Sequence, residues 1–489
     1  MTLFSQFFEQ ARLAARALAE FGEGLFSPTV RLGITGLSRA GKTVFITALV
    51  HGLMRGGRFP VFEPLANGRI AAVRLAPQQH DAVPRFDYEN HVRALVEERR
   101  WPDSTRQISE LRLLIDYQSE NGAMRTLTLD IVDYPGEWLL DLPLLGKSYE
   151  QWSAESVTQA RGGARASLAT PWLSHLATVD PIAPADESVA IEAARLFTGY
   201  LQACRDERYA MSLLPPGRFL MPGDLGGSPA LTFAPLELPE GAEPPYGSLW
   251  AMMRRRYDSY REVVVQPFFR EHFARLDRQI VLVDTLAALN AGPDAVRDLQ
   301  GALVSILDCF RIGSGGIFNA LFRPRVSKIL FAATKADHLH HSSHDRLEAI
   351  LGEMVSAAIS QAGFEGAEVD VIALAAVRAT REGHVRGEGG SLPSIIGFPA
   401  SDETVASEKF DVQGEIAVFP GDLPENAGTL FDPNTDAFRG LAGGCGKSAD
   451  FRFVRFRPPQ LEQIADGLPA LPHIRLDRAM QFLFGDRLR

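Results

Sequence analysis

Apolar and polar positions along the chain switch repeatedly between a strand-like and a helix-like pattern. Short apolar runs bounded by polar or turn residues predict buried strands at 32–35, 127–132, 277–284, 328–337 and 369–374. Helix-like spacing separates these runs, most clearly at 88–100, 295–310 and 344–362. This alternation predicts an α/β fold with a mostly parallel sheet and helices on both faces.

One pair of neighbouring strands departs from this alternation. Leu111, Leu113 and Ile115 alternate with polar residues, and Asn121-Gly122 is a typical hairpin turn before the run at 127–132. We therefore expect two antiparallel strands joined by a tight turn. The segment 58–77 has no clear periodicity, and we expect it to be irregular.

Two long segments lack the strand and helix alternation of the core. Residues 139–273 contain helical patterns at 188–203 and 249–260 among Pro- and Gly-rich loops, which predicts a mostly helical insertion. Residues 382–489 contain a Gly-rich stretch at 382–399, strand patterns at 415–419 and 451–456, a loop at 422–447 and an amphipathic helix at 475–484. We expect this β-rich C-terminal extension to pack on a core formed by 27–138 and 274–381.

The N-terminal residues 1–26 have the pattern of an amphipathic helix. Its apolar face carries Phe4, Phe7, Phe8 and Phe21 at helical spacing, and its polar face carries charges of both signs. Packing on the chain's own core is the favoured interpretation. Contact with a membrane surface or with a partner protein remains open.

Composition narrows the class of protein. The 489 residues exceed one ordinary core, and 46% apolar with 22% charged residues is typical of a soluble globular protein. A net charge of −10 argues against nucleic acid as a partner. The three cysteines have no metal-binding spacing, and no apolar stretch is long enough to span a membrane. We expect a cytoplasmic location, with peripheral contact at the inner membrane left open.

The octapeptide from Gly36 to Thr43 fits G-x-x-x-x-G-K-[ST], the loop that wraps nucleotide phosphates. A strand precedes it and a helical pattern follows it, as a functional loop requires. Lys42 is expected to neutralise the β- and γ-phosphates, and the Thr43 hydroxyl to bind Mg²⁺. The expected nucleotide contacts in this stretch are Gly36, Ser38, Arg39, Ala40, Gly41, Lys42, Thr43 and Val44.

The strand at 127–132 delivers Asp133-Tyr134-Pro135-Gly136-Glu137, a D-x-x-G element. In a small-GTPase-like core such an aspartate holds Mg²⁺ through water, and the glycine N–H senses the γ-phosphate. We expect these roles for Asp133 and Gly136. Thr105 is the candidate for the threonine of the first switch and for a second Mg²⁺ contact, with Ser104 as the alternative.

The strand at 328–337 ends in Thr334-Lys335-Ala336-Asp337, where GTPases carry N-K-x-D. A carboxylate at Asp337 would accept two N–H groups from guanine, a pair that adenine lacks, and the Lys335 stem would cover the base. Thr334 replaces the usual asparagine, which weakens the case for guanine over adenine. Ala376 and Val377, after the final predicted strand, complete the expected base site.

Arg39 is unusual in the middle of a phosphate loop. Loops of the form G-x-x-R-x-G-K-[ST] resemble those of guanylate-binding proteins and atlastins, in which the arginine acts on the phosphates as an internal arginine finger. Such a residue contributes several orders of magnitude in rate. A solvent-exposed or salt-bridged arginine is the alternative.

Glu137 occupies the position of the glutamine that orients water in Ras-like proteins. A carboxylate accepts a proton from water but is repelled by the nucleotide, so turnover is expected to be slow without Arg39 or a partner. Capping of the following helix is the alternative role.

The segments GLSRAGKT, DYPGEWLLDLPLL, FFREHFARLDRQIVLVD and TKADHL together resemble the YcjX-like family of bacterial P-loop NTPases. The resemblance implies a stress-associated nucleotide hydrolase of the cytoplasm. The resulting hypothesis is a Mg²⁺-dependent GTPase that acts as a molecular switch, with protein partners bound through 139–273 or the N-terminal helix. An ATPase of the same fold and a nucleotide-gated scaffold with negligible turnover are the alternatives.

Overall fold

The computed structural model describes most of the chain. The described residues are 28–37, 39–78, 83–103, 107–239, 241–311, 326–362, 367–387, 390–400, 404–405, 408–409, 414–431, 453–461 and 469–489. The predicted N-terminal helix, Ser38, Ser104 and Thr105 lie outside them. No helix among the described residues is long and apolar enough to cross a membrane.

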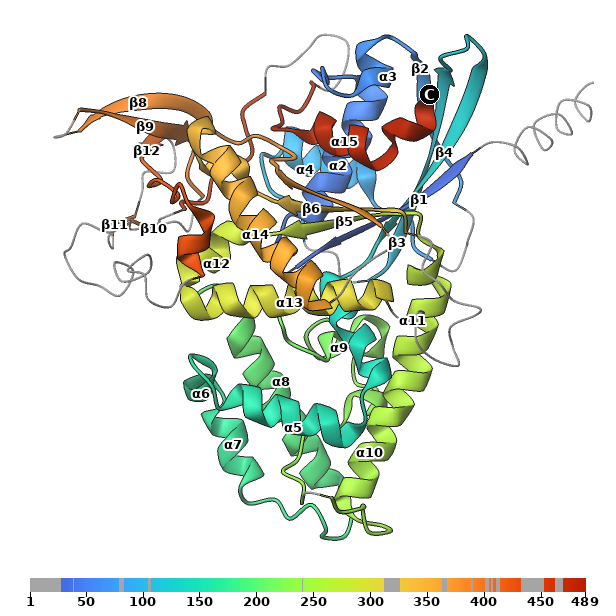
Figure 1. Cartoon of the computed structure of the whole chain (residues 1–489), viewed down its shortest axis with the longest axis vertical. Coiled ribbons are helices and arrows are strands. Elements are labelled where there is room, and N and C mark those ends of the chain that lie inside the picture. The colour runs from blue at the N-terminus through green and yellow to red at the C-terminus, as the bar shows by residue number, and fades with distance from the viewer. Residues whose placement is uncertain are drawn as a thin grey trace, which may run out of the picture.

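A seven-stranded sheet forms the centre of the molecule (Figure 1), in the order β2-β3-β4-β1-β5-β6-β7. Its strands are β1 (Thr29–Gly36), β2 (Ile70–Ala76), β3 (Ser109–Gln118), β4 (Met124–Asp133), β5 (Arg278–Val283), β6 (Lys328–Ala333) and β7 (Glu368–Ala373). The pairs from β4 through β1 to β7 are parallel, whereas β2-β3 and β3-β4 are antiparallel. This confirms the predicted mostly parallel α/β sheet and the antiparallel hairpin.

Helices cover both faces of the sheet because its strands alternate their side chains between two cores. The helices of these two layers are α2 (Lys42–Arg55), α3 (Glu63–Ala66), α4 (Tyr88–Val96), α12 (Thr285–Ala291), α13 (Pro293–Arg311), α14 (His344–Ala362) and α15 (Leu476–Phe484). In β5, Ile280 and Leu282 pack on one side with α2, α4 and α15, whereas Val281 and Val283 pack on the other side with α13 and α14.

The segment between β4 and β5 forms a helical body beyond one edge of the sheet (Figure 1). It contains the 3₁₀ segment η1 (Gly136–Gly146), α5 (Tyr149–Ala160), α6 (Arg165–Leu168), α7 (Thr170–Leu176), α8 (Glu187–Arg205), α9 (Gly217–Leu220), α10 (Leu249–Tyr260), a π-helical turn (Arg261–Val265), α11 (Gln266–Glu271) and the short 3₁₀ turns Gly223–Leu225, Pro229–Leu231 and Phe273–Arg275. Buried aromatic rings, among them Trp152, Trp172 and Phe197, fill its centre. The predicted helices at 188–203 and 249–260 are confirmed.

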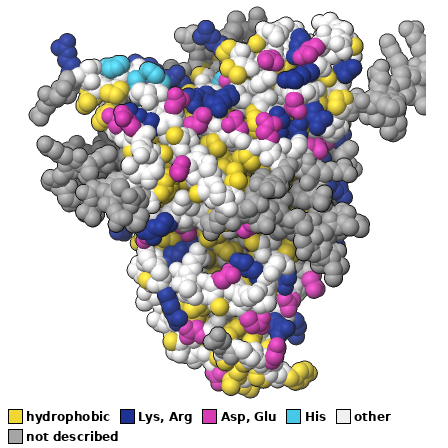
Figure 2. Space-filling view, viewed as in Figure 1, with side chains coloured by type: hydrophobic (Ala, Val, Ile, Leu, Met, Phe, Trp, Pro, Cys, Tyr) yellow, Lys and Arg dark blue, Asp and Glu magenta, His cyan; other side chains and the backbone are white. Residues whose placement is uncertain are grey.

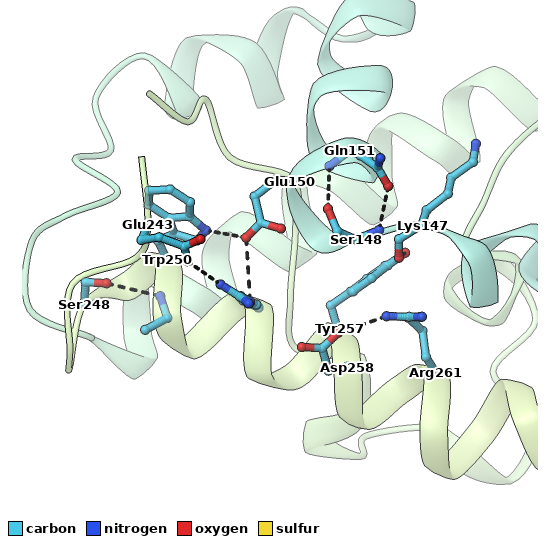
Figure 3. A network of polar contacts seen from close by, with 12 residues as sticks. Lys147, Ser148, Glu150, Gln151, Glu243, Ser248, Trp250, Tyr257, Asp258 and Arg261 are labelled. Carbon is cyan, nitrogen blue, oxygen red and sulfur yellow. Dashed lines mark hydrogen bonds and ion pairs between the residues drawn. The ribbon is translucent and has the colours of Figure 1, made fainter. Parts of the chain in front are cut away.

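Polar contacts tie α5 to α10 inside this body (Figure 3). Ser148 and Gln151 form a capping box at the start of α5. Glu150 accepts a hydrogen bond of 3.1 Å from the Trp250 indole N–H, and the Tyr257 hydroxyl donates to the Lys147 carbonyl oxygen at 3.2 Å. Both contacts lie at the N-terminal end of α5 and connect it to two positions along α10.

The structure differs from the sequence-based prediction in two segments. The stretch 58–77, expected to be irregular, contains α3 and β2, so that prediction is wrong. Strand β2 is a half-exposed edge strand with three alanines, and its alternation is weak; pairing with β3 stabilises it. Strand 451–456 is not seen in its described part, where Phe456 forms an isolated bridge with Pro399.

The C-terminal region contains a second, antiparallel sheet and the predicted terminal helix. Its described elements are β8 (Arg381–Gly387), β9 (Gly390–Gly397), β10 (Thr404–Val405), β11 (Glu408–Lys409), β12 (Ile416–Val418), the 3₁₀ turn Ala427–Leu430, α15 and the 3₁₀ turn Gly485–Leu488. Strands β12, β9 and β8 form an antiparallel sheet. Helix α15, by contrast, enters the core beside α2, where Met480, Leu483 and Phe484 are fully buried. The domain boundaries stay a prediction.

Candidate functional site

The candidate phosphate loop lies where β1 ends and α2 begins. Gly41 is the N-cap of α2 and has a φ of 79°, and Arg39 also has a positive φ, of 60°. Ala40 between them is buried, and its N–H donates to the Leu37 carbonyl oxygen at 3.0 Å. Backbone turns of this kind point N–H groups at one place, and the first turn of α2 adds its own free N–H groups.

Lys42 and Asp133 bring the two predicted phosphate elements together. Strands β1 and β4 are parallel neighbours, with Ile34 opposite Asp133, so the loop after β1 and the end of β4 meet at one edge. The Lys42 ammonium lies 2.8 Å from Asp133 Oδ1, and the two side chains are 10% and 1% exposed. The Lys42 ammonium and the Asp133 carboxylate therefore form a buried ion pair between the loop and the end of β4.

The oxygen atoms beside this pair fit a hard cation such as Mg²⁺. Asp133 is fully buried, the Ser109 hydroxyl donates to its Oδ2 at 3.4 Å, and Thr43 directly follows Lys42. The Thr43 hydroxyl donates to the Asp103 carbonyl oxygen at 3.3 Å. Asp103, the last described residue before Ser104, thus lies beside the start of α2.

Gly136 packs directly on the phosphate loop. A Cβ atom at this position would lie 2.0 Å from the carbonyl oxygen of Gly36, a distance that no side chain tolerates. The start of η1 and the end of β1 are thus in backbone contact. This contact explains why glycine stands at the fourth position of the D-x-x-G element.

Glu137 and Arg39 both contact the end of α8 in the helical body. Glu137 is 8% exposed, and its Oε1 lies 3.1 Å from an Arg205 Nη atom. Arg39 donates to Glu207 at 2.9 Å, and both of these side chains are more than half exposed. The two side chains expected to act on the γ-phosphate are therefore paired with residues only two positions apart.

The T-K-x-D element lies at the same edge, after β6. The Lys335 ammonium pairs with Asp284, which follows β5, and the Thr334 hydroxyl donates to the Val283 carbonyl oxygen at 3.3 Å. Asp337 is 4% exposed, and its Oδ2 accepts a hydrogen bond of 2.8 Å from the Ala379 N–H. One carboxylate oxygen of Asp337 thus already has a backbone partner.

The other predicted residues that the structure describes are partly or fully buried near the ends of β1 and β7. Ala376 is half-buried and Val377 is buried after β7, and Val44 packs half-buried against the core beneath α2. Ser38, Ser104 and Thr105 lie outside the described residues. The structure thus groups Gly36, Lys42, Thr43, Asp133 and Gly136 on one side, and Thr334, Lys335 and Asp337 two strands away along the same edge.

A surface hollow lies between the phosphate loop, the end of α8 and the strand ends. It is lined by Leu37 and Arg39 of the loop, Arg205 and Glu207 at the end of α8, and Asp284 and Lys335 at the strand ends. The hollow flanks the Lys42–Asp133 pair without including it.

Arg205 and Glu207 were missed by sequence reasoning because the segment 138–273 contains no recognisable nucleotide motif. The sequence shows only that both residues lie near the end of a predicted helix. No local pattern indicates that this end faces the phosphate loop. The position of Asp284 weakly indicates a role at the site, because polar residues at the carboxyl ends of parallel strands commonly line a ligand site.

Comparisons with known proteins show the family of the chain. The chain matches the model of the YcjX-like family, DUF463, over residues 30–488. It is 38% identical over 476 residues to the "Ras-like GTPase YcjX" of Escherichia coli (strain K12), covering 94% of this chain and 96% of the relative. It is 34% identical over 485 residues to the "Ras-like GTPase YcjX" of Shewanella oneidensis, covering 94% of each. With a GTPase-like P-loop core at its centre, the chain belongs to the YcjX-like family.

Proposed function

We propose that this protein binds GTP with Mg²⁺ and hydrolyses it to GDP and phosphate. The observation that carries the proposal is the contact of 2.8 Å between Lys42 and Asp133. It brings the lysine of a phosphate loop and the aspartate of a D-x-x-G element to one strand edge. These are the groups that hold phosphates and metal in GTPases.

Thr43 and Asp133 are the residues that would hold Mg²⁺, with Thr105 or Ser104 as a further ligand. When bound, the ion neutralises charge that develops on the β- and γ-phosphate oxygens. Lys42 would exchange Asp133 for phosphate oxygens, and the Gly136 N–H would contact the γ-phosphate. The close packing of Gly136 on Gly36 then transmits the presence of that phosphate to η1.

The end of α8 supplies the link between nucleotide and helical body. The ion pair with Arg205 restrains the Glu137 carboxylate, and the ion pair with Glu207 keeps the Arg39 guanidinium at the surface. Release of Arg39 from Glu207 would let it turn to the phosphates, because an exposed ion pair is weak. We propose that this exchange makes the helical body a nucleotide-dependent switch, in which partner proteins of a stress response bind through 139–273.

Guanine is the proposed base because Asp337 retains one carboxylate oxygen that is not bonded to Ala379. Affinity for GDP and ADP tests this directly. We expect wild type to bind GDP more tightly than ADP, and Asp337→Ala to lower GDP affinity by about tenfold or more while ADP affinity stays unchanged. Glu353→Ala, an exposed carboxylate on α14, serves as the control. Equal affinities for GDP and ADP in wild type would contradict the guanine assignment.

A nucleotide-gated scaffold with negligible turnover is the second candidate. The pairing of Glu137 with Arg205 favours it, because this largely buried carboxylate already has a charged partner. Single-turnover hydrolysis of Mg·GTP by wild type and Lys42→Ala separates the two functions. A wild-type rate well above that of the variant supports the enzyme. Equal rates for wild type and Lys42→Ala, with nucleotide still bound by wild type, would favour the scaffold over the enzyme.

A further inference from the structure

A cluster of histidines lies beyond the base site, where the loop after Asp337 meets β8. The turn at His341–Ser343 leads into α14, and β8 begins at Arg381. Figure 2 shows histidine side chains gathered on the surface near β8. None of the proposed nucleotide contacts belongs to this cluster.

Three side chains of the cluster place their ligand atoms close together. One ring nitrogen each of His340 and His341 and one oxygen of Glu382 lie within 4.8 Å of one another. The His341 Nδ1 lies 2.6 Å from Glu382 Oε2, and the His340 and His341 ring centroids are 4.2 Å apart. His384 approaches from β8, with its ring centroid 5.5 Å from that of His340. Two imidazoles and one carboxylate thus place ligand atoms together, with a third imidazole beside His340.

Neighbouring groups orient the cluster. His340 is 6% exposed, and its Nδ1 lies 3.0 Å from the Ser342 hydroxyl oxygen, which fixes the plane of the ring. The Arg378 guanidinium lies 3.2 Å from Glu382 Oε1, so Oε2 is the oxygen that faces His341. Hydrogen-bonding partners of this kind hold the ligands of known metal sites in position.

We propose that His340, His341 and Glu382 bind a divalent transition metal ion of the zinc class. Two imidazoles and one carboxylate form a donor set that suits Zn²⁺, and small movements of exposed His341 would bring the three atoms to bonding distance. His384 or water completes the coordination. The ion would join the loop after β6 to β8, two segments more than forty positions apart in the chain.

Zinc titration of the full chain tests the proposal. The protein is first treated with a chelator, then titrated with Zn²⁺ against a chromophoric competitor in excess Mg²⁺, which occupies oxygen-rich sites. We expect wild type to bind one equivalent of Zn²⁺. The affinity of His341→Ala and of Glu382→Gln for Zn²⁺ should be lower by about tenfold or more. His175→Ala, in α7, is the control and should bind as wild type does.

Absorption of Co²⁺ in place of Zn²⁺ provides a second readout that does not depend on affinity alone. Intense visible bands, lost in His341→Ala but kept in His175→Ala, would report tetrahedral or five-coordinate ligation by this cluster. Melting temperatures of the metal-free variants equal to that of wild type show that they fold. Wild-type affinity in both His341→Ala and Glu382→Gln, or no zinc bound by wild type, would overturn the proposal.

Discussion

Single residues in η1 are constrained by backbone contacts on both sides. Gly136 packs on Gly36, and Gly217 of α9 packs on Glu137, where an added Cβ would lie 2.0 Å from a carbonyl oxygen in each case. Two glycines thus let three chain segments approach within backbone contact. The D-x-x-G element is held between the phosphate loop and the helical body.

Gly136→Ala is expected to destabilise the protein by roughly 1–3 kcal/mol, because the new methyl group forces the backbones of β1 and η1 apart. Urea unfolding measures this change. Gly146→Ala is the matched control at the other end of η1, since nothing lies within 4 Å of a Cβ there. A Gly136→Ala protein as stable as the Gly146→Ala protein would refute the packing argument.

Asp141 is a buried carboxyl group within η1. Its Oδ1 accepts from the Gly217 N–H at 2.6 Å and its Oδ2 from the Tyr260 hydroxyl at 2.7 Å. Burial raises the pKa of Asp141 from 3.8 to about 6, although these hydrogen bonds and the nearby Arg218 charge oppose the shift. The folded protein therefore holds this proton more tightly than the unfolded chain does.

The raised pKa of Asp141 predicts that its contribution to the free energy of unfolding falls as the pH rises. The contribution of Asp141 to the free energy of unfolding is largest below pH 3.8 and is lost as the pH rises through about 6. The loss amounts to about 3 kcal/mol, from 1.36 kcal/mol per pKa unit. Relative to Asp141→Asn, wild type should lose stability in urea between about pH 4 and pH 7. Parallel pH profiles for the two proteins would count against the raised pKa.

At the scale of elements, the end of α8 pairs by side-chain charges with two of the candidate catalytic residues. Helix α8 is amphipathic and packs Phe197 and Leu201 into the body, which fixes the place where it ends. Arg205 and Glu207 follow from that packing. Their pairing with Glu137 and Arg39 depends on the position of a whole helix.

Glu207→Ala is expected to raise the single-turnover rate of GTP hydrolysis by up to about fivefold. The exposed ion pair that holds Arg39 is worth up to about 1 kcal/mol, and its removal raises the population of free Arg39 accordingly. Arg208→Ala, the adjacent control, should leave the rate unchanged, and the gain should vanish in the double variant Arg39→Ala/Glu207→Ala. A Glu207→Ala rate equal to that of wild type would exclude Glu207 as a restraint on Arg39.

At the scale of the whole molecule, the last helix completes the core. Leu483 is fully buried beside residues of α2 and the sheet, and its carbonyl oxygen accepts a hydrogen bond of 2.9 Å from Arg278 of β5. Asp486 pairs with the same guanidinium at 2.8 Å. Residues near position 480 thus support a strand that begins at 278.

Leu483→Ala is expected to destabilise the protein by about 2–5 kcal/mol, because the cavity lies in the closed core. Ile191→Ala, an exposed aliphatic residue of α8, is the matched control and should change stability by less than about 0.5 kcal/mol. Urea unfolding or the melting temperature distinguishes them. Equal, small effects would show that α15 is dispensable for the core.

The sequence by itself determined the parallel strands, the hairpin at Asn121-Gly122 and the phosphate loop, because each depends on a local pattern of a few residues. It did not reveal β2, whose stability comes from pairing with β3. Only the tertiary structure decided that Lys42 meets Asp133, that Arg39 and Glu137 meet the end of α8, and that Asp337 bonds to Ala379. These contacts join segments far apart in the chain, and the packing of helices and strands, which no local pattern encodes, brings them together.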